Sequence, residues 1–272
     1  MSDALGQTGR RFAEIRATGR GALVGFLHVG YPDMPTSLAA LRALAGDGST
    51  PGVDLVEVGI PYSDPVIDGV TIQRAGTRAL QRGVRTRDVF AGVEAVASTG
   101  TPAVVMTYWN LVEQYGAARF ARDLANAGGA GAITPDLTPD EAEEWLEVSD
   151  AAGLDRIFLV SPSSTDERLA RTVTACRGWV YATSVMGVTG SRAITSTAAP
   201  ALVARVRSET DLPVGVGLGV SDGAQAAEVA AYADAVIVGS AFVRRLLDTA
   251  DREAGLRAIS ELTADLADGV RR

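Results

Sequence analysis

Short apolar runs typical of β-strands recur along the whole chain and alternate with helical segments. Eight such runs begin at Ala22, Val53, Pro102, Ala130, Arg156, Trp179, Pro213 and Asp234. Most segments between them carry Ala, Leu, Arg and Glu at helical spacing, as in SLAALRALA from Ser37. Strand-helix alternation favours a parallel sheet with right-handed crossovers, and eight units in about 250 residues predict a (β/α)8 barrel. A doubly wound open sheet is the alternative, because short strands are easily miscounted.

Two further helices fit around this plan. One near Ala4 to Thr18 is expected to cap the barrel floor, and one over Arg252 to Ala267 is expected to pack outside. The sequence has no Pro/Ser-rich linker, low-complexity tract or charge block that would mark a domain boundary. We therefore expect a single barrel domain over residues 1–272.

Charge and cysteine content exclude several classes of protein. The formal net charge is −8 and basic residues do not cluster, which argues against binding nucleic acid or an anionic membrane. No apolar run reaches the roughly 18 residues of a membrane helix. Arg10 and Arg11 precede no apolar stretch, so they are interpreted as a solvated helix face rather than an export signal. The lone Cys176 cannot form an internal disulfide or a multi-cysteine metal site, which fits the cytoplasm.

The segment LVEVGIPYSDPVIDGVTI, from Leu55 to Ile72, places a glutamate inside a strand that should be buried. A buried carboxylate is either paired or held with a raised pKa for proton transfer. The strands contain almost no basic residue apart from Arg156, so Glu57 is predicted to be a general acid/base rather than a structural ion-pair partner. Asp68 is a candidate to share that chemistry, because neighbouring carboxyl groups with different pKa values define acid and base roles. Asp64, before Pro65, is expected to be structural or to lie at an interface.

Glycines gather at three later strand ends, each ahead of a helix. They are Gly187 and Gly190, Gly217 and Gly219, and Gly239 with Ser240. Helix N-termini bind phosphate through backbone N–H groups, and the loops after strands seven and eight are the usual phosphate site of a barrel. The alternative is that each glycine merely permits a turn. Three at neighbouring strand ends favour a phosphate site, and the polar loop Gly187 to Thr197 is typical of a mobile lid.

Two other motifs are weaker. GVSDG from Gly219 matches a nucleophile-elbow pattern, but the only histidine, His28, precedes it, so Ser221 is interpreted as a helix N-cap. His28 is expected to be a satisfied strand-end histidine, because a metal site needs companions. Aromatic side chains near strand ends could line a pocket for a flat substrate or simply fill the core: Phe26, Tyr108, Trp109 and Tyr181.

With these residues assembled, the chain closely resembles the tryptophan synthase alpha subunit family over nearly its whole length. VEVGIPYSDPVIDG is the most specific part, supported by VMTYWNLVEQYG, SVMGVTGSR, VGLGVSDGAQAAEV and VIVGSAFV. The resemblance implies a barrel enzyme that cleaves indole-3-glycerol phosphate to indole and glyceraldehyde 3-phosphate without a cofactor of its own. It also implies an alpha2-beta2 heterotetramer, in which indole passes to a beta subunit that carries pyridoxal phosphate.

The resemblance also implies residue roles. Glu57 would protonate indole C3 and take the glycerol hydroxyl proton, and Asp68 would accept the indole N–H bond. Thr189 would contact the Asp68 loop, and the phosphate would be bound by Gly190, Gly219, Gly239 and Ser240. The indole pocket would be lined by Phe26, Tyr108 and Tyr181. The beta-subunit interface would lie near Pro61, Asp64 and Asn110. Val70 and His28 depart from the family pattern, which leaves the rigidity of this loop and the first-strand pocket wall open.

Three other functions remain open at this point. They are a free-standing indole-releasing lyase, a catalytically weak protein that activates a partner subunit, and a different phosphosugar barrel. The chain contains no lysine, which removes a Schiff-base aldolase. Retention of both Glu57 and Asp68 argues against a protein that only binds a partner.

Overall fold

The computed structural model describes residues 5–46, 48, 50–183, 198–249 and 251–272. Nine parallel strands form one sheet in the order β5-β4-β3-β2-β1-β9-β8-β7-β6. The strands are β1 (Ala22–His28), β2 (Leu55–Gly59), β3 (Ala103–Met106), β4 (Gly131–Ile133), β5 (Asp155–Ile157), β6 (Leu159–Val160), β7 (Val180–Thr183), β8 (Val214–Gly217) and β9 (Ala235–Val238). The two ends of that order, β5 and β6, are separated in the chain by Phe158 alone, so the sheet closes into a barrel.

All eight predicted strands are present, and the ninth arises because the fifth is split. β5 pairs with β4, whereas β6 pairs with β7. Phe158 lies where the chain changes partner, and its buried side chain anchors that point. The (β/α)8 barrel is therefore confirmed, and the closed strand order excludes a doubly wound open sheet.

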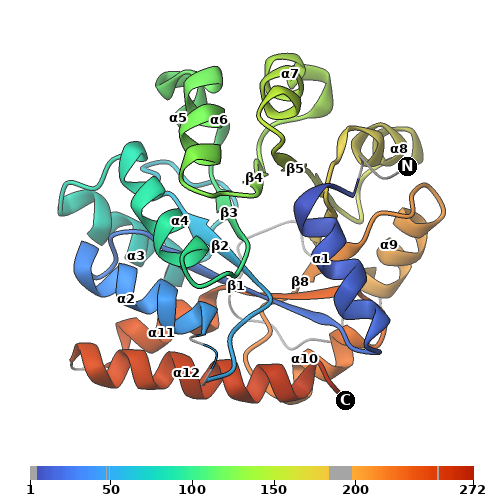
Figure 1. Ribbon diagram of the computed structural model, residues 1–272. Coiled ribbons are helices and arrows are strands. Elements are labelled where there is room, and N and C mark those ends of the chain that lie inside the picture. Colours follow the sequence, from blue (N-terminus) through green and yellow to red (C-terminus); the bar gives the residue numbers. More distant parts are fainter. Residues whose placement is uncertain (1–4, 47, 49, 184–197, 250) are drawn as a thin grey trace.

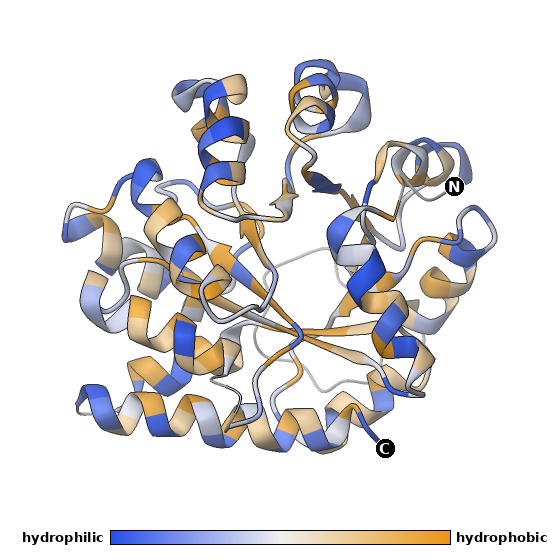
Figure 2. Ribbon diagram, in the orientation of Figure 1, coloured by the Kyte–Doolittle hydropathy of each residue, from blue (hydrophilic) through white to orange (hydrophobic). Residues whose placement is uncertain are grey.

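Helices surround the strands on the outside of the barrel (Figure 1). They are α1 (Gly6–Ala17), α2 (Met34–Ala45), α3 (Val70–Gln81), α4 (Val89–Ala97), α5 (Trp109–Tyr115), α6 (Ala117–Asn126), α7 (Glu143–Ala151), α8 (Asp166–Ala175), α9 (Ala198–Arg207), α10 (Gly223–Ala230), α11 (Ser240–Leu247) and α12 (Arg252–Gly269), with 3-10 turns η1 (Thr86–Asp88) and η2 (Pro139–Glu141). Hydrophobic residues dominate the strands, whereas the helices carry both hydrophilic and hydrophobic residues (Figure 2). This is the pattern expected of parallel strands that are covered on both faces.

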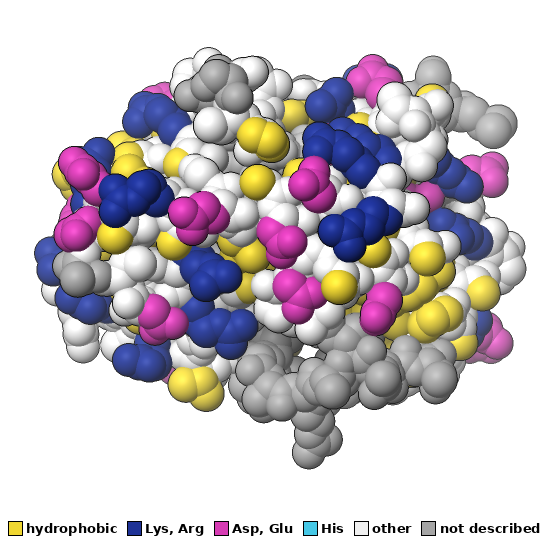
Figure 3. Space-filling model, turned by 90° about the horizontal axis from the view of Figure 1, so that it is seen from below, with side chains coloured by type: hydrophobic (Ala, Val, Ile, Leu, Met, Phe, Trp, Pro, Cys, Tyr) yellow, Lys and Arg dark blue, Asp and Glu magenta, His cyan; other side chains and the backbone are white. Residues whose placement is uncertain are grey.

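The two additional helices lie where the sequence predicts them. Phe12 and Ile15 of α1 are buried in the same cluster as inward-facing strand residues such as Val24 and Leu55, so α1 closes the barrel floor. α12 packs outside, against α2, α10 and α11. Seen from below, the face that includes α12 mixes acidic, basic and apolar side chains (Figure 3).

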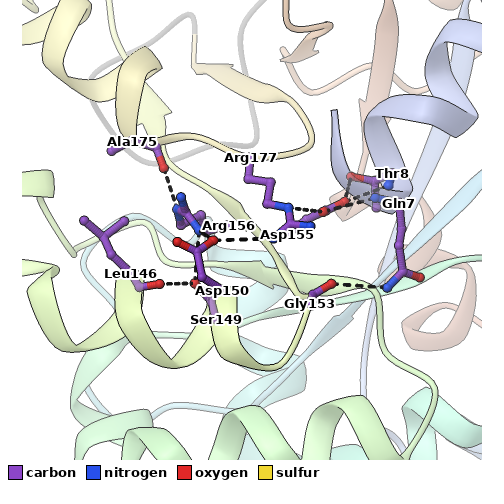
Figure 4. Close-up of polar contacts among 10 residues, drawn as sticks. All are labelled: Gln7, Thr8, Leu146, Ser149, Asp150, Gly153, Asp155, Arg156, Ala175 and Arg177. Atoms are coloured by element: carbon purple, nitrogen blue, oxygen red, sulfur yellow. Dashed lines mark hydrogen bonds and ion pairs between the residues drawn. The ribbon is translucent and has the colours of Figure 1, made fainter. Parts of the chain in front are cut away.

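Three buried aspartates hold α1 and the adjoining loop to the barrel floor. Asp54, just before β2, accepts two hydrogen bonds from Arg20 at 2.6 and 2.7 Å. Asp234, just before β9, pairs with Arg16 of α1 at 3.1 Å. Asp155 of β5 accepts bonds from the Thr8 backbone N–H at 2.7 Å and the Thr8 hydroxyl at 2.6 Å (Figure 4). Asp54 and Asp234 also accept the buried backbone N–H groups of Leu23 and Val214, each at 2.9 Å, so each of the three carboxylates satisfies a donor that would otherwise be buried without a partner.

We expect Asp155→Ala to lower the free energy of unfolding by about 3 kcal/mol, because it removes a completely buried carboxylate and leaves its donors unpaired. Urea denaturation measures the change. Asp150→Ala is the matched control: Asp150 pairs with Arg156 and Arg177 from a side chain that is 55% exposed, so a loss below about 1 kcal/mol is expected. Equal losses in the two variants would contradict this account of the floor.

Candidate active site

A cavity of about 990 Å³ opens at the carboxyl ends of the strands. Eight of the ten predicted catalytic and substrate-binding residues line it: Phe26, Glu57, Asp68, Tyr108, Tyr181, Gly219, Gly239 and Ser240. The other two, Thr189 and Gly190, and the predicted Gly187 to Thr197 lid lie outside the described residues. The fold thus brings together residues separated by more than half of the chain.

Glu57 is the buried acid of this cavity. Its side chain stands on β2 opposite Phe26 of β1, and the residue is 2% exposed. Its Oε1 has no hydrogen-bond partner among the described residues. Burial raises the pKa of Glu57 to about 8. The alternative of a structural glutamate paired with an arginine is therefore wrong for the described chain, and the group is suited to giving or taking a proton near neutral pH.

Asp68 is held at the cavity by Tyr108. The Tyr108 hydroxyl donates to Asp68 Oδ1 at 3.2 Å and accepts from the backbone N–H of Ile67 at 3.2 Å. Gln73 Nε2 donates to the Asp68 carbonyl at 2.8 Å. Burial raises the pKa of Asp68 to about 6, and the Tyr108 hydrogen bond opposes that rise. At neutral pH Asp68 is therefore mainly an anion, while Glu57 is mainly protonated.

Phe26 of β1 and Tyr181 of β7 contribute aromatic surface to the lining of the cavity. Tyr181 stacks on Trp179 with 5.5 Å between ring centroids. Burial, helped by the nearby Glu57, raises the pKa of Tyr181 well above its usual value, so the hydroxyl stays neutral. Two glycines make room for these rings: a Cβ on Gly59 would lie 2.5 Å from the Phe26 ring, and one on Gly217 would lie 2.6 Å from the Tyr181 hydroxyl.

The glycine-rich end of the cavity follows β8 and β9. Gly219 has φ +75°, a backbone conformation that other residues rarely adopt. Gly239 precedes α11 and Ser240 is its first residue, and both line the cavity. The first N–H groups of a helix have no intrahelical partner, so the α11 N-terminus offers donors and a favourable dipole to an anion.

The N-cap of α10 lies one residue later than predicted. Asp222, not Ser221, accepts the backbone N–H of Gln225 at 2.9 Å. Ser221 instead donates its N–H and its hydroxyl to Gln225 Oε1 at 2.8 and 3.0 Å. Its hydroxyl is thereby bound to an amide and has no histidine to activate it.

The prediction of a satisfied strand-end histidine holds only in part for His28. It lines the cavity, and its ring nitrogens make only weak hydrogen bonds, to the backbones of Gly59 and Ile72. Burial lowers the pKa of His28 to about 4, and these two backbone hydrogen bonds offset that effect only in part. The imidazole is therefore neutral at physiological pH.

Asp136 is a cavity residue that the sequence analysis missed. It lies just after β4, and its carboxylate accepts the backbone N–H of Trp109, at the start of α5, at 2.9 and 3.1 Å. Burial raises the pKa of Asp136, while the Trp109 bond opposes the rise. The sequence signal that could have identified Asp136 is its position in TPDL, directly after the predicted strand that begins at Ala130.

The three predicted interface residues differ in exposure. Asp64 and Asn110 are exposed, and Asn110 Nδ2 donates to the Tyr62 hydroxyl at 3.5 Å. Pro61 is buried within the chain. Two residues after Asp64, Val66 is the most exposed of the large apolar side chains in the described structure, at 73%.

No three His, Cys, Asp or Glu side chains of the described residues lie close enough together to hold a metal ion. No described helix is both long enough and apolar enough to cross a membrane.

Comparison with known proteins connects this geometry to a family. The family model described as tryptophan synthase alpha chain matches residues 12–271. The tryptophan synthase alpha chain of Salinispora tropica is 60% identical over 98% of each chain. That of Acidothermus cellulolyticus is 61% identical over 99% of this chain and 97% of the relative. A structure of Mycobacterium tuberculosis tryptophan synthase shares 56% identity with a TM-score of 0.91, covering 98% of this chain and 99% of the other. The chain therefore belongs to the tryptophan synthase alpha chain family.

Proposed function

We propose that this chain is a lyase that cleaves indole-3-glycerol phosphate to indole and glyceraldehyde 3-phosphate by a retro-aldol reaction. The observation that carries the proposal is the pair of carboxyl groups in one cavity, Glu57 with its pKa near 8 and Asp68 with its pKa near 6. One acid is thus protonated and the other ionised at neutral pH, as the reaction requires.

In the proposed mechanism, protonated Glu57 gives its proton to indole C3. This step breaks the aromaticity of the pyrrole ring and places positive charge on the ring nitrogen, whose N–H donates to the Asp68 carboxylate. Glu57, now ionised, takes the proton of the glycerol hydroxyl next to C3. The carbon-carbon bond breaks, its electron pair returns to the ring, and the hydroxyl carbon becomes the aldehyde. Asp68 stabilises the transient cation electrostatically.

Shape and polarity of the cavity support this substrate. Phe26, Tyr108 and Tyr181 offer apolar and aromatic surface to an indole, and Gly219, Gly239 and Ser240 offer backbone donors to a phosphate. No step draws on a cofactor of this subunit. The described residues therefore include the acid/base pair, the aromatic side chains and the backbone N–H groups that the proposed mechanism uses.

We also propose that the chain works in an alpha2-beta2 heterotetramer with a beta subunit that carries pyridoxal phosphate. The exposed loop with Asp64 and Val66, beside the cavity, supports a partner surface there. Adding a purified beta subunit separates the alternatives. A large increase in the rate of indole release is expected, whereas an unchanged rate would favour a free-standing lyase.

The pH dependence of kcat/KM tests the acid/base pair. We expect a bell-shaped profile of kcat/KM against pH, with an acid limb near pH 6 and a basic limb near pH 8. Asp68 loses its negative charge below about pH 6, and Glu57 loses its proton above about pH 8. Initial rates of indole release between pH 5 and 9.5 measure it. A profile that is flat from pH 5.5 to 8.5 would contradict the roles of both groups.

Tyr108→Phe is expected to move the acid limb to higher pH, because the Tyr108 hydrogen bond lowers the pKa of Asp68. The variant also loses the bond to Ile67, so kcat/KM at pH 7 should fall roughly tenfold. Tyr115→Phe is the matched control, since the Tyr115 hydroxyl bonds Asp123 away from the cavity. An unmoved acid limb would show that Tyr108 does not hold Asp68.

A further inference from the structure

An arginine lies at the end of the cavity where the phosphate is proposed to bind. Arg244 stands on α11 four residues after Ser240, and both residues line the cavity. Residues four apart share one face of a helix, and helical side chains lean toward the N-terminus. The Arg244 side chain therefore extends along α11 toward Gly239 and Ser240.

Neither Arg244 nor Ser240 has a side-chain partner in the described parts of the chain. Arg244 forms no ion pair or side-chain hydrogen bond there. Ser240 is 8% exposed, and its hydroxyl likewise has no hydrogen-bond partner among these residues. A cation and a nearly buried hydroxyl thus remain available to one ligand, on one face of one helix.

The charged side chains that line the cavity come from different elements around it. Glu57 and Asp68 belong to β2 and the loop that follows it, Asp136 follows β4, Arg168 stands on α8, and Arg244 stands on α11 after β9. A phosphate dianion is repelled by a chain of formal net charge −8, so a fixed cation at the α11 end would offset that repulsion. A guanidinium can also donate two hydrogen bonds to one phosphate group.

We propose that Arg244 is a phosphate-binding residue, which pairs with the phosphate of the substrate while Gly239 and Ser240 donate to it from the α11 N-terminus. The inference rests on the proposed function for the identity of the substrate. It assigns Arg244 to substrate affinity and not to the chemical step, because the phosphate does not change during cleavage.

The test compares Arg244→Gln with Arg245→Gln, an adjacent and exposed arginine of the same helix that does not line the cavity. Arg244→Gln is expected to raise KM for indole-3-glycerol phosphate about 10- to 50-fold and to leave kcat within about twofold. Calorimetric titration with inorganic phosphate should show a similar loss of affinity. Arg245→Gln should match the wild type in all three measurements, and Arg244→Lys should recover part of the affinity.

The outcomes separate this inference from the proposed function. If the wild type cleaves the substrate and Arg244→Gln keeps the KM of Arg245→Gln, the inference is wrong and the proposed function stands. If phosphate affinity depends on Arg244 but the wild type releases no indole, the inference stands for another phosphorylated ligand and the proposed function is wrong. A fall in kcat at unchanged KM would also overturn the inference. Thermal unfolding of each variant shows whether the fold is retained, and Arg244→Lys replaces Arg244→Gln if it is not.

Discussion

Glu57→Gln is expected to lower kcat for indole release by about 10³-fold while KM stays within about twofold, because glutamine keeps the shape of the side chain but cannot transfer a proton. Steady-state measurement of indole release gives both constants. Glu94→Gln, on the exposed face of α4, is the matched control and should retain the wild-type rate. A Glu57→Gln variant with near wild-type kcat would show that another group moves the proton.

The stability of the same variant distinguishes lost chemistry from lost folding. The folded state raises the pKa of Glu57 from 4.5 to about 8, so the folded protein binds a proton that the unfolded chain releases between these pH values. The stability that this group contributes is therefore present at pH 4 and is lost as pH rises toward 8. Glu57→Gln has no such loss. The free energy of unfolding of the variant relative to that of the wild type should therefore be higher at pH 8 than at pH 5. A variant that loses stability relative to the wild type as the pH rises from 5 to 8 would contradict an unpaired, buried Glu57.

Asp68→Asn is expected to lower kcat by about 10²-fold, because the indole N–H would lose the anion that stabilises its positive charge. The acid limb of the pH profile should vanish with it, since no group with a pKa near 6 would remain in that role. Initial rates of indole release by Asp68→Asn and by the wild type between pH 5 and 8 measure both effects.

Asp64→Asn, in the same loop, provides the comparison for Asp68→Asn. Asp64 is exposed, and its carboxylate accepts a hydrogen bond from the Ser63 hydroxyl at 2.5 Å. The turnover of the isolated Asp64→Asn chain should stay near the wild-type value, and any effect should appear in binding of a beta subunit. Equal losses of turnover from both substitutions would indicate a loop effect rather than a charge effect.

The architecture could be predicted from the sequence because its signal is local. Each strand is a short apolar run with turn residues at its ends, and the same pattern repeats eight times. The split of the fifth strand at Phe158 was not predictable, because it results from a change of pairing partner between β4 and β7. The position of the α10 cap was missed by one residue, since serine and aspartate are both good N-caps and only the backbone geometry selects Asp222.

The candidate site could be predicted in part for the same reason. Glu57 stands out because a carboxyl group in an apolar strand conflicts with its surroundings. The hydrogen bond from Tyr108 to Asp68 joins residues forty positions apart, so no local sequence pattern predicts it. The burial of the His28 ring is likewise a product of packing against α3, where a Cβ on Gly76 would lie 3.4 Å from its Nε2.

The most direct test of the central claim is the balance of products from the purified wild-type chain. Indole-3-glycerol phosphate is incubated with the chain in the presence of a chelator, with and without a purified beta subunit, and both products are quantified over time. The account predicts that indole and glyceraldehyde 3-phosphate appear in equal amounts, at a rate that falls about 10³-fold in Glu57→Gln. Absence of both products under both conditions, or indole release that does not depend on Glu57, would contradict it.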